Sequence, residues 1–429
     1  MPTTEPNTYA LDSMAMPLPY LPVCKNSPLV FRLMVTLREE IDIAALKQAV
    51  LDLAPRFPIM YTRLRRGFVW HRLEDAADFD IVRRDEGYPC RPFDIFKGET
   101  PLLRVLYRKR AIGIECTHLT CDGNGGSVYL NSLAARYLEL LGHSIEKCHN
   151  VLDHRDKPSA AELEDYYRVA YQKKGGGLGV STVAVKPAFL GFRERRPDYL
   201  QVTKVVLPLD ELKRLTCETY GGCTITQYLC AVYASAFLKL RNKRNKPLRL
   251  SVPTNLRNYW DTCTLRNFVG MAHINVKVDK PEFREVLAVV RREMEANLSF
   301  EKQQELVNQS IRVLELWPAK IIPGFVKRSA IFLGAPFVRR FRWPHSSTLS
   351  NVGYIKLPPS LAEHITNYTF HIGEMDTCRI TCCAAGCGNA LTVVFSAVND
   401  STVIQDFCVD FLRREGLRLT CEQSEVCGA

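Results

Sequence analysis

The sequence has no continuous apolar run long enough to span a bilayer. Its longest uncharged run, residues 380–399, is interrupted by Gly386, Gly388 and Asn389, so it is better interpreted as two strands around a turn. The first seven residues are polar and lack the basic and apolar regions of a signal peptide. We therefore expect a cytoplasmic protein rather than a secreted or membrane-spanning one.

Acidic residues are the minority among the charged side chains. The 57 Lys and Arg outnumber the 46 Asp and Glu, and the net charge of +11 favours anionic partners such as a phosphorylated cofactor, a carrier protein, a membrane surface or nucleic acid. No nucleic-acid-binding module is recognisable, so we do not expect that last partner. The hydrophobic content of 46% is ordinary for a soluble globular protein.

Disulfide bonds and metal sites are not expected, although the chain has 16 cysteines. At 429 residues it is not a small secreted scaffold, so reduced thiols are expected. The cluster Cys378, Cys382, Cys383 and Cys387 matches zinc-ligand spacing only loosely. In a strand pair, alternation would point neighbouring thiols to opposite faces and oppose one tetrahedral cage. We interpret these cysteines as small buried hydrophobic residues.

Strand and helix patterns alternate along the chain, which predicts an α/β fold. The glycine-rich run at 173–179 is the clearest linker, because it is flexible and has no apolar periodicity. We predict an N-terminal sub-domain over 1–172, a crossover linker over 173–199 and a C-terminal sub-domain over 200–429. Periodicity predicts strands over 29–37, 201–207 and 248–253, and helices over 43–53, 161–172, 211–219, 224–240, 281–298, 302–316 and 403–415.

The most informative stretch is 117–126, Thr-His-Leu-Thr-Cys-Asp-Gly-Asn-Gly-Gly. Residues before it have the pattern of a strand or hairpin and residues after it that of a helix, so His118 is expected just before a turn. A neutral imidazole is well suited to take a proton from an alcohol or amine. Asp122 would fix the turn, and Gly123 would allow a close approach. A core histidine beside a turn is the alternative.

A second stretch, 319–342, mixes large apolar residues with six basic residues and no acid. A basic, aromatic segment of this kind can make peripheral contact with a membrane surface. The alternative, which we favour, is a helix and loop that bury their apolar side against the sheet.

Further blocks occur in an order that is more specific than any one of them. They are Tyr9-Ala10-Leu11-Asp12, Phe57-Pro58-Ile59-Met60 and Gly67-Phe68-Val69-Trp70, then the stretch around His118, then 251–257, 264–270 and Ser350-Asn351-Val352-Gly353. With this set the chain resembles, over nearly its full length, the superfamily of chloramphenicol acetyltransferase and peptide-synthetase condensation domains. It looks most similar to the alcohol-acetyltransferase-like and polyketide-associated acyltransferase branch.

The resemblance implies an α+β sandwich of two similar sub-domains, a pseudo-dimer with its active site in a tunnel at their interface. In that comparison His118 is the general base, and Asp122 is structural and paired with Arg257, or with Arg266 as second choice. An acyl-CoA such as acetyl-CoA is then a donor substrate rather than a tightly bound cofactor, and the acceptor is a small molecule. Possible oxyanion or substrate contacts are Thr254, Ser350 and Asn351.

The chain also departs from the family pattern. The doubled histidine of condensation domains is absent because Thr117 precedes His118, and the Asp-Phe-Gly-Trp-Gly block of plant acyltransferases is missing. No carrier domain is recognisable. We therefore expect a free-standing acyltransferase that moves an acyl group, such as acetyl, from CoA to an alcohol or amine. Two alternatives remain: a stand-alone condensation or lipid acyltransferase whose donor is bound to a carrier protein, and a non-catalytic binding scaffold of the same fold.

Overall fold

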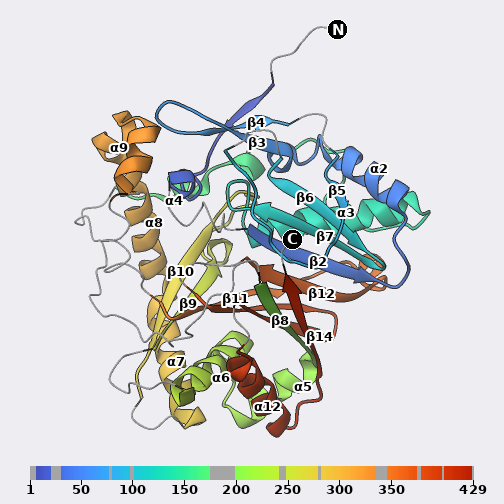
Figure 1. Ribbon diagram of the computed structural model, residues 1–429, viewed down its shortest axis with the longest axis vertical. Helices are drawn as coiled ribbons and strands as arrows, with labels where there is room; N and C mark the ends of the chain where they lie inside the picture. The colour runs from blue at the N-terminus through green and yellow to red at the C-terminus, as the bar shows by residue number, and fades with distance from the viewer. Residues whose placement is uncertain are drawn as a thin grey trace.

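The computed structural model describes residues 6–20, 30–76, 80–96, 101–173, 199–240, 248–278, 282–331, 333, 345–373, 378–398 and 401–427. The strands in these ranges form sheets of three, five and seven strands, and helices cover the two larger ones. Figure 1 shows the five-stranded sheet in the upper half of the molecule and the seven-stranded sheet below it. The predicted mixed α/β fold is confirmed.

The five-stranded sheet is built mainly by the N-terminal part of the chain. Helices α2 (Ile43–Leu53) and α3 (Gly123–Leu140) pack against it, and their apolar side chains fill the first core. All its strand pairs are antiparallel except β5 with β6. The spatial order is β12 (Ile365–Ile372), β2 (Val30–Leu37), β7 (Ala111–Thr117), β6 (Leu103–Arg108) and β5 (Val82–Arg84).

The seven-stranded sheet comes entirely from the chain after residue 198. Helices α6 (Ile225–Leu240), α7 (Phe283–Asn297) and α12 (Val403–Arg414) cover one of its faces and form the second core with it. The spatial order is β10 (Val269–Val276), β9 (Leu248–Asn255), β11 (Ser347–Tyr354), β13 (Ile380–Cys387), β14 (Ala390–Ala397), β8 (Tyr199–Pro208) and β15 (Thr420–Cys427).

Shorter elements complete the described part of the chain. A three-stranded sheet has the order β1 (Thr8–Ala10), β4 (Arg72–Asp75) and β3 (Thr62–Arg65). The other named helices and helical turns are η1 (Leu18–Tyr20), η2 (Pro58–Tyr61), η3 (Ala161–Leu163), α4 (Tyr166–Ala170), α5 (Leu209–Arg214), η4 (Leu215–Thr219), η5 (Leu256–Asn258), α8 (Phe300–Glu315), α9 (Trp317–Ile321) and α11 (Pro359–Ala362), and residues 324–331 are also helical. None of the described helices is both long and apolar enough to cross a membrane.

Strand β12 connects the two halves of the chain. It follows the seven-stranded sheet's β11 in sequence, yet it pairs with β2 along its whole length, from Ile365 opposite Leu37 to Ile372 opposite Phe31. The first core also contains side chains from β8, β13 and β14. The C-terminal half therefore completes the N-terminal sheet and shares its core. Most of the predicted linker, 174–198, lies outside the described residues, so the boundary stays a prediction.

The predicted helix over 161–172 is wrong, because the structure has the short turn η3, a break, and the five-residue α4. The break falls at Glu164, whose ψ of 140° is extended. Asp165 accepts hydrogen bonds from the Ser13 amide and hydroxyl at 2.9 and 2.6 Å, and the Thr264 hydroxyl donates to the Glu164 carbonyl at 2.6 Å. Contacts with distant residues thus override the local helical preference.

The cysteine cluster behaves as the strand alternation predicts. Cys382 packs into the second core, whereas Cys383 and Cys387 pack into the first. Burial raises the pKa of the Cys383 thiol to about 12 and that of Cys387 to about 11, so both are protonated at neutral pH. Within the described ranges, no three His, Cys, Asp or Glu side chains are grouped so that they could bind a metal ion.

Candidate active site

His118 lies in a tight turn between β7 and α3. The Thr120 amide and hydroxyl both donate to the Thr117 carbonyl at 3.0 Å, and the Leu119 amide donates to the Thr117 hydroxyl at 2.9 Å. Two residues later Asp122 is the N-cap of α3, and its Oδ1 accepts from the Gly125 amide at 3.0 Å. A carboxylate satisfies the free amides at a helix N-terminus. The turn thus holds the imidazole at the end of a central strand.

Asp122 is fully buried, and both of its oxygens are occupied. Oδ1 caps α3, while Oδ2 accepts from Arg257 Nη1 at 2.7 Å and from the Phe268 amide at 2.9 Å. Arg257 is held in turn by the carbonyls of Thr264 and Arg266, at 2.9 and 2.7 Å. The structure therefore brings the predicted partners together, and Asp122 has no exposed surface with which to contact a substrate.

Asn267 fixes the orientation of the histidine. His118 Nδ1 lies 2.9 Å from Asn267 Oδ1. The amide nitrogen of the same side chain donates to the His118 carbonyl at 2.8 Å and to Asp12 Oδ2 at 2.7 Å. Both are acceptors, so the amide nitrogen must face them and its oxygen must face the ring. Nδ1 then carries the proton, and Nε2 has a free lone pair.

Asp12 anchors this arrangement from the other side. It is fully buried, accepts from the Ala15 amide at 2.8 Å and lies 3.5 Å from Arg266 Nε. Desolvation raises its pKa to about 6, although the charge of Arg266 acts in the opposite direction. Arg266 thus pairs with Asp12 and not with Asp122. One chain of hydrogen bonds therefore runs from Asp12 through Asn267 to His118.

The surroundings of His118 keep its ring neutral. Burial lowers the pKa of the imidazole, an effect that the Asn267 hydrogen bond and the Asp122 charge partly oppose. The Phe31 ring packs beside it with centroids 5.1 Å apart, and the residue as a whole is only partly buried. A partly accessible, neutral imidazole with a free Nε2 can accept a proton from a bound hydroxyl or amine.

Glycines allow the start of α3 to approach the second half of the chain. A Cβ on Gly125 would lie 2.2 Å from the Leu265 carbonyl oxygen, which is closer than any contact allows. A Cβ on Gly123 would lie 3.3 Å from a methyl group of Val352 on β11. The close approach predicted at Gly123 is thus tighter still at Gly125. The helix N-terminus therefore lies directly against the 264–267 segment and β11.

The other predicted contacts are distributed over both faces of the seven-stranded sheet. Asn351 donates to the Thr226 hydroxyl of α6 at 3.0 Å, and Thr254 interacts with Tyr259, so the described contacts of neither involve His118. Ser350 is buried and pairs with Cys383, whose side chain lies in the first core. Its hydroxyl therefore points to the side of the sheet that faces α3. Of the three, Ser350 is the one whose side chain is directed to the His118 side.

Cys121 lies close to His118 in sequence but faces away from it. Its thiol is buried in the first core, 3.8 Å from the sulfur of Cys116.

Two residues of the site were not predicted from the sequence: Asn267, and Asp12 in its role as the anchor of Asn267. Both lie in blocks on which the family resemblance rests. The signal was absent because the contact joins residues 255 positions apart.

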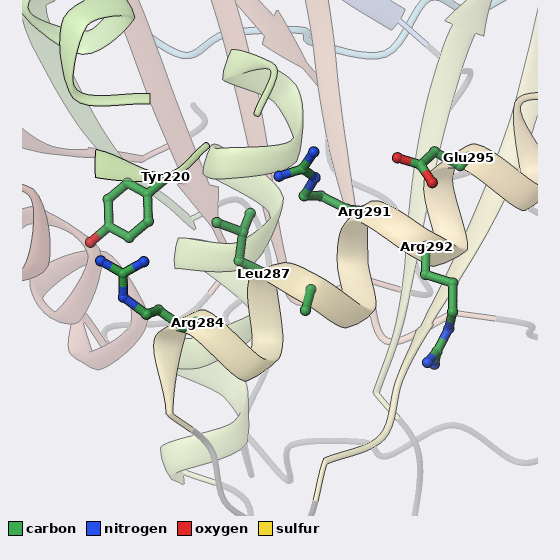
Figure 2. A pocket seen from close by; sticks show the side chains of 7 residues that line it. Tyr220, Arg284, Leu287, Arg291, Arg292 and Glu295 are labelled. Atoms are coloured by element: carbon green, nitrogen blue, oxygen red, sulfur yellow. The ribbon is translucent and has the colours of Figure 1, made fainter. Parts of the chain in front are cut away.

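A hollow that was not predicted from the sequence lies on the outer side of α7. It has a volume of about 420 Å³ and is lined by Tyr220, Leu287, Ala288, Glu295, Arg284, Arg291 and Arg292. Figure 2 shows Arg284 beneath the Tyr220 ring and Arg292 turned away from it. The Arg284 guanidinium is 5.3 Å from the ring centroid, and Arg291 Nη1 is 3.4 Å from the Gly221 carbonyl. Three guanidinium groups make this surface basic.

Comparison with known proteins places the fold in a class. No family model and no curated protein matches the chain. Solved structures do: the chain has the fold of condensation-type domains of peptide and polyketide synthases and of related acyltransferases, as the sequence resemblance predicted. These identities are low, so the likeness concerns the fold.

Three of these structures cover almost the whole chain. Polyketide synthase associated protein 5 from Mycobacterium tuberculosis is 14% identical over 96% of this chain and 98% of its own, with a TM-score of 0.62. F. graminearum TRI101, solved with ethyl coenzyme A, is 10% identical over 95% of this chain and 97% of its own, with a TM-score of 0.61. Trichothecene 15-O-acetyltransferase from Fusarium sporotrichioides is 13% identical over 95% of each chain, with a TM-score of 0.59.

Proposed function

We propose that the protein is an acyltransferase that moves an acyl group, such as acetyl, from a CoA thioester to an alcohol or amine. The observation that carries the proposal is the hydrogen bond from His118 Nδ1 to Asn267 Oδ1, which leaves Nε2 free as a base. The fold supports it, since one structure of this fold is an acetyltransferase and another was solved with ethyl coenzyme A.

In the proposed reaction His118 Nε2 removes the proton of the acceptor hydroxyl or amine as its oxygen or nitrogen attacks the thioester carbonyl. The carbon–sulfur bond of the resulting tetrahedral intermediate then breaks, and the imidazolium returns the proton to the departing sulfur. Asn267 Oδ1 accepts from Nδ1–H throughout and stabilises the ring while it is charged. No covalent acyl-enzyme is required, and holding both substrates in register supplies much of the remaining acceleration.

We further propose that the two substrates meet at the junction of the two halves of the chain, in a tunnel of a pseudo-dimeric architecture. Residues of the N-terminal half, His118 and Asp122, contact Asn267 and Arg257 of the C-terminal half, which supports this location. Ser350 is the remaining candidate for a hydroxyl that contacts the substrate or the oxyanion.

The test is thiol release from acetyl-CoA in the presence of pooled alcohols and amines, comparing the wild type with His118→Ala. We expect release that requires an acceptor and falls by about 100-fold or more in the variant. Cys121→Ala is the matched control, since its buried thiol faces away from the histidine. Equal release by His118→Ala and wild type would remove His118 from the chemistry.

A second candidate function is acyl transfer from a donor bound to a carrier protein. The arginine-lined hollow on α7 favours it, because a carrier that bears a phosphopantetheine arm presents anionic groups to its partner. The test is the triple variant Arg284→Glu, Arg291→Glu and Arg292→Glu. A loss of carrier-dependent transfer with unchanged transfer from free acyl-CoA supports the carrier. Equal effects on both donors exclude this use of the surface.

A further inference from the structure

Large apolar side chains are exposed around α9. We call them the apolar surface; each is between 58% and 78% exposed, and they are Phe68, Trp317, Ile321, Phe325 and Leu333. Single exposed apolar residues are common, whereas a group of them marks an interaction site. In Figure 1 the orange helices near the α9 label project from the upper left of the molecule, beside the β3–β4 hairpin whose loop carries Phe68.

Two distant segments are joined to form this surface. The Gly324 amide donates to the Phe68 carbonyl at 2.6 Å, and Lys327 Nζ donates to the Val69 carbonyl at 2.9 Å. A Cβ on Gly324 would lie 3.5 Å from the Phe68 carbonyl oxygen, so the two backbones are closely packed. The hairpin loop and the helical residues 324–331 therefore present their apolar side chains together.

In this region basic side chains face the protein and apolar side chains face the solvent, which is the reverse of an ordinary surface helix. Lys327 Nζ points inward and lies 3.4 Å from the centroid of the Trp70 ring, and the Arg328 guanidinium lies 4.3 Å from that of Phe96. Phe325 on this segment and the nearby Leu333 are exposed to water. The segment uses cation–π contacts to attach itself to the protein and leaves its apolar residues for a partner. The sequence favoured an apolar side buried against the sheet, but Ile321, Phe325 and Leu333 are exposed instead, and residues 332 and 334–342 lie outside the described residues.

The charge around the apolar surface is mostly positive, although Glu315 at the end of α8 pairs with Lys320 and Glu74 pairs with Arg63 and Arg65. Residues 316–333 contain three basic residues and no acid, and residues 63–72, which include the hairpin loop, contain four arginines and no acid. A partner with an apolar interior and an anionic exterior would match both properties. The surface also projects outward at α9 (Figure 1). A projecting surface can insert side chains into a lipid layer, whereas a bound peptide helix would need a groove.

We propose that the apolar surface docks the protein onto an anionic lipid bilayer. Trp317, Phe325 and Leu333 enter the boundary between headgroups and acyl chains, and Lys320 and Arg66 lie at the level of the lipid phosphates. The attachment is peripheral, because the apolar residues sit on short helices and a loop. It does not depend on the proposed acyl transfer and can be tested without a substrate.

The test is flotation of the full-length protein with vesicles of phosphatidylcholine alone and of phosphatidylcholine mixed with phosphatidylglycerol. We expect partition onto the anionic vesicles that is about tenfold stronger than onto the neutral ones and that weakens at high salt. Phe325→Ser and Trp317→Ser should each lower the partition by about tenfold, since each removes a large apolar side chain from the bilayer.

Leu51→Ser is the matched control, because Leu51 is as exposed as these residues but lies on α2. It should bind vesicles like the wild type, and unchanged circular dichroism and melting temperature would establish that all variants fold. The proposal is overturned if the wild type does not bind anionic vesicles or if Phe325→Ser binds them as well as the wild type. Self-association that Phe325→Ser abolishes, without vesicle binding, would instead assign the surface to a second copy of the chain.

Discussion

At the scale of single residues, the protein orients one histidine through a hydrogen-bonded series that begins at a buried carboxylate. Asp12 holds Asn267, and Asn267 holds both the ring and the backbone carbonyl of His118. An amide in this position selects one tautomer without adding a charge beside the base. A carboxylate there would raise the pKa of the imidazole, whereas the amide leaves it low enough for a neutral base.

Asn267→Ala should therefore lower kcat by about 10- to 100-fold, because the ring loses its fixed tautomer and orientation. KM for the acyl donor should stay within about twofold, since the described contacts of Asn267 are with His118 and Asp12. If Asn267 had only a structural role, the substitution would leave the tautomer of the His118 ring unchanged. Nitrogen-15 NMR of the histidine ring distinguishes the two: the wild type should carry its proton on Nδ1, and the variant should lose that preference.

The pH dependence of the reaction follows from the lowered pKa of His118. Protonation removes the base, so kcat/KM falls as the pH drops through that pKa. Because burial moves the pKa below the ordinary value of 6.5, the acid limb of the profile with an alcohol acceptor should lie below pH 6.5 and the rate should be flat above it. A measured limb at or above pH 6.5 would contradict the described environment of the ring.

Asp122→Ala should reduce stability, because it leaves the buried Arg257 guanidinium without its carboxylate and removes the cap of α3. A loss of about 3–5 kcal/mol in the free energy of unfolding is expected from chemical denaturation. The double variant Asp122→Ala with Arg257→Met should recover part of this loss, since no charge is then left unpaired. Additive losses would mean that the two side chains are not coupled.

Sequence separation explains which of these residues could be predicted. His118 and Asp122 lie four positions apart in one recognisable motif, and Arg257 was inferred by resemblance. The contacts of Asn267 with His118 and Asp12 span 149 and 255 positions, and no local pattern encodes them. Asn351 and Ser350 are neighbours in sequence, but strand alternation sends them to opposite faces of the sheet.

At the scale of elements, the helices with clear apolar periodicity were located within two residues of their observed ends. The Thr224 N-cap is present as a reciprocal pair, with Gln227 N donating to the Thr224 hydroxyl at 3.1 Å and Thr224 N to Gln227 Oε1 at 2.8 Å. The predicted 161–172 helix was wrong because tertiary contacts break it. Strand β15 was missed, because its side chains at Glu422, Gln423 and Ser424 are exposed and lack an apolar alternation.

Gly125→Ala tests how closely α3 must approach the second half of the chain. The added methyl group would overlap the Leu265 carbonyl oxygen, so the helix must move away from the 264–267 segment. Overpacking of this kind costs about 1–3 kcal/mol and should also lower the rate, because the displaced segment carries Asn267. Asn124→Ala, in the same helical turn, is the control and should change neither the melting temperature nor the rate appreciably.

At the scale of the whole molecule, the two halves are not independent units. The pairing of β12 with β2 and the shared first core tie them together, and the candidate site joins residues of both halves. This dependence could not be predicted from composition, because the glycine-rich run at 173–179 is an ordinary linker signal. The pairing partner of a strand is set by the tertiary fold and is not readable from the strand's own sequence.

Fragments 1–172 and 200–429, produced separately, should therefore fail to fold as single domains. The first would expose the edge of β2, and the second would carry an unpaired β12. Each fragment alone should lack a cooperative thermal transition, and mixing them should restore one. A cooperative transition in the isolated 1–172 fragment would contradict the dependence on β12.

The position of β12 also has a consequence during synthesis of the chain. Thr36 and Thr366, which hydrogen-bond across the β2–β12 pair, are 330 residues apart. At a translation rate of about 5–20 residues per second, β12 is synthesised roughly 15–70 s after the apolar strand β2 with which it pairs. Throughout that interval the nascent chain presents an open hydrophobic edge, so the yield of native protein should depend on chaperones that shield β2 until translation is nearly complete.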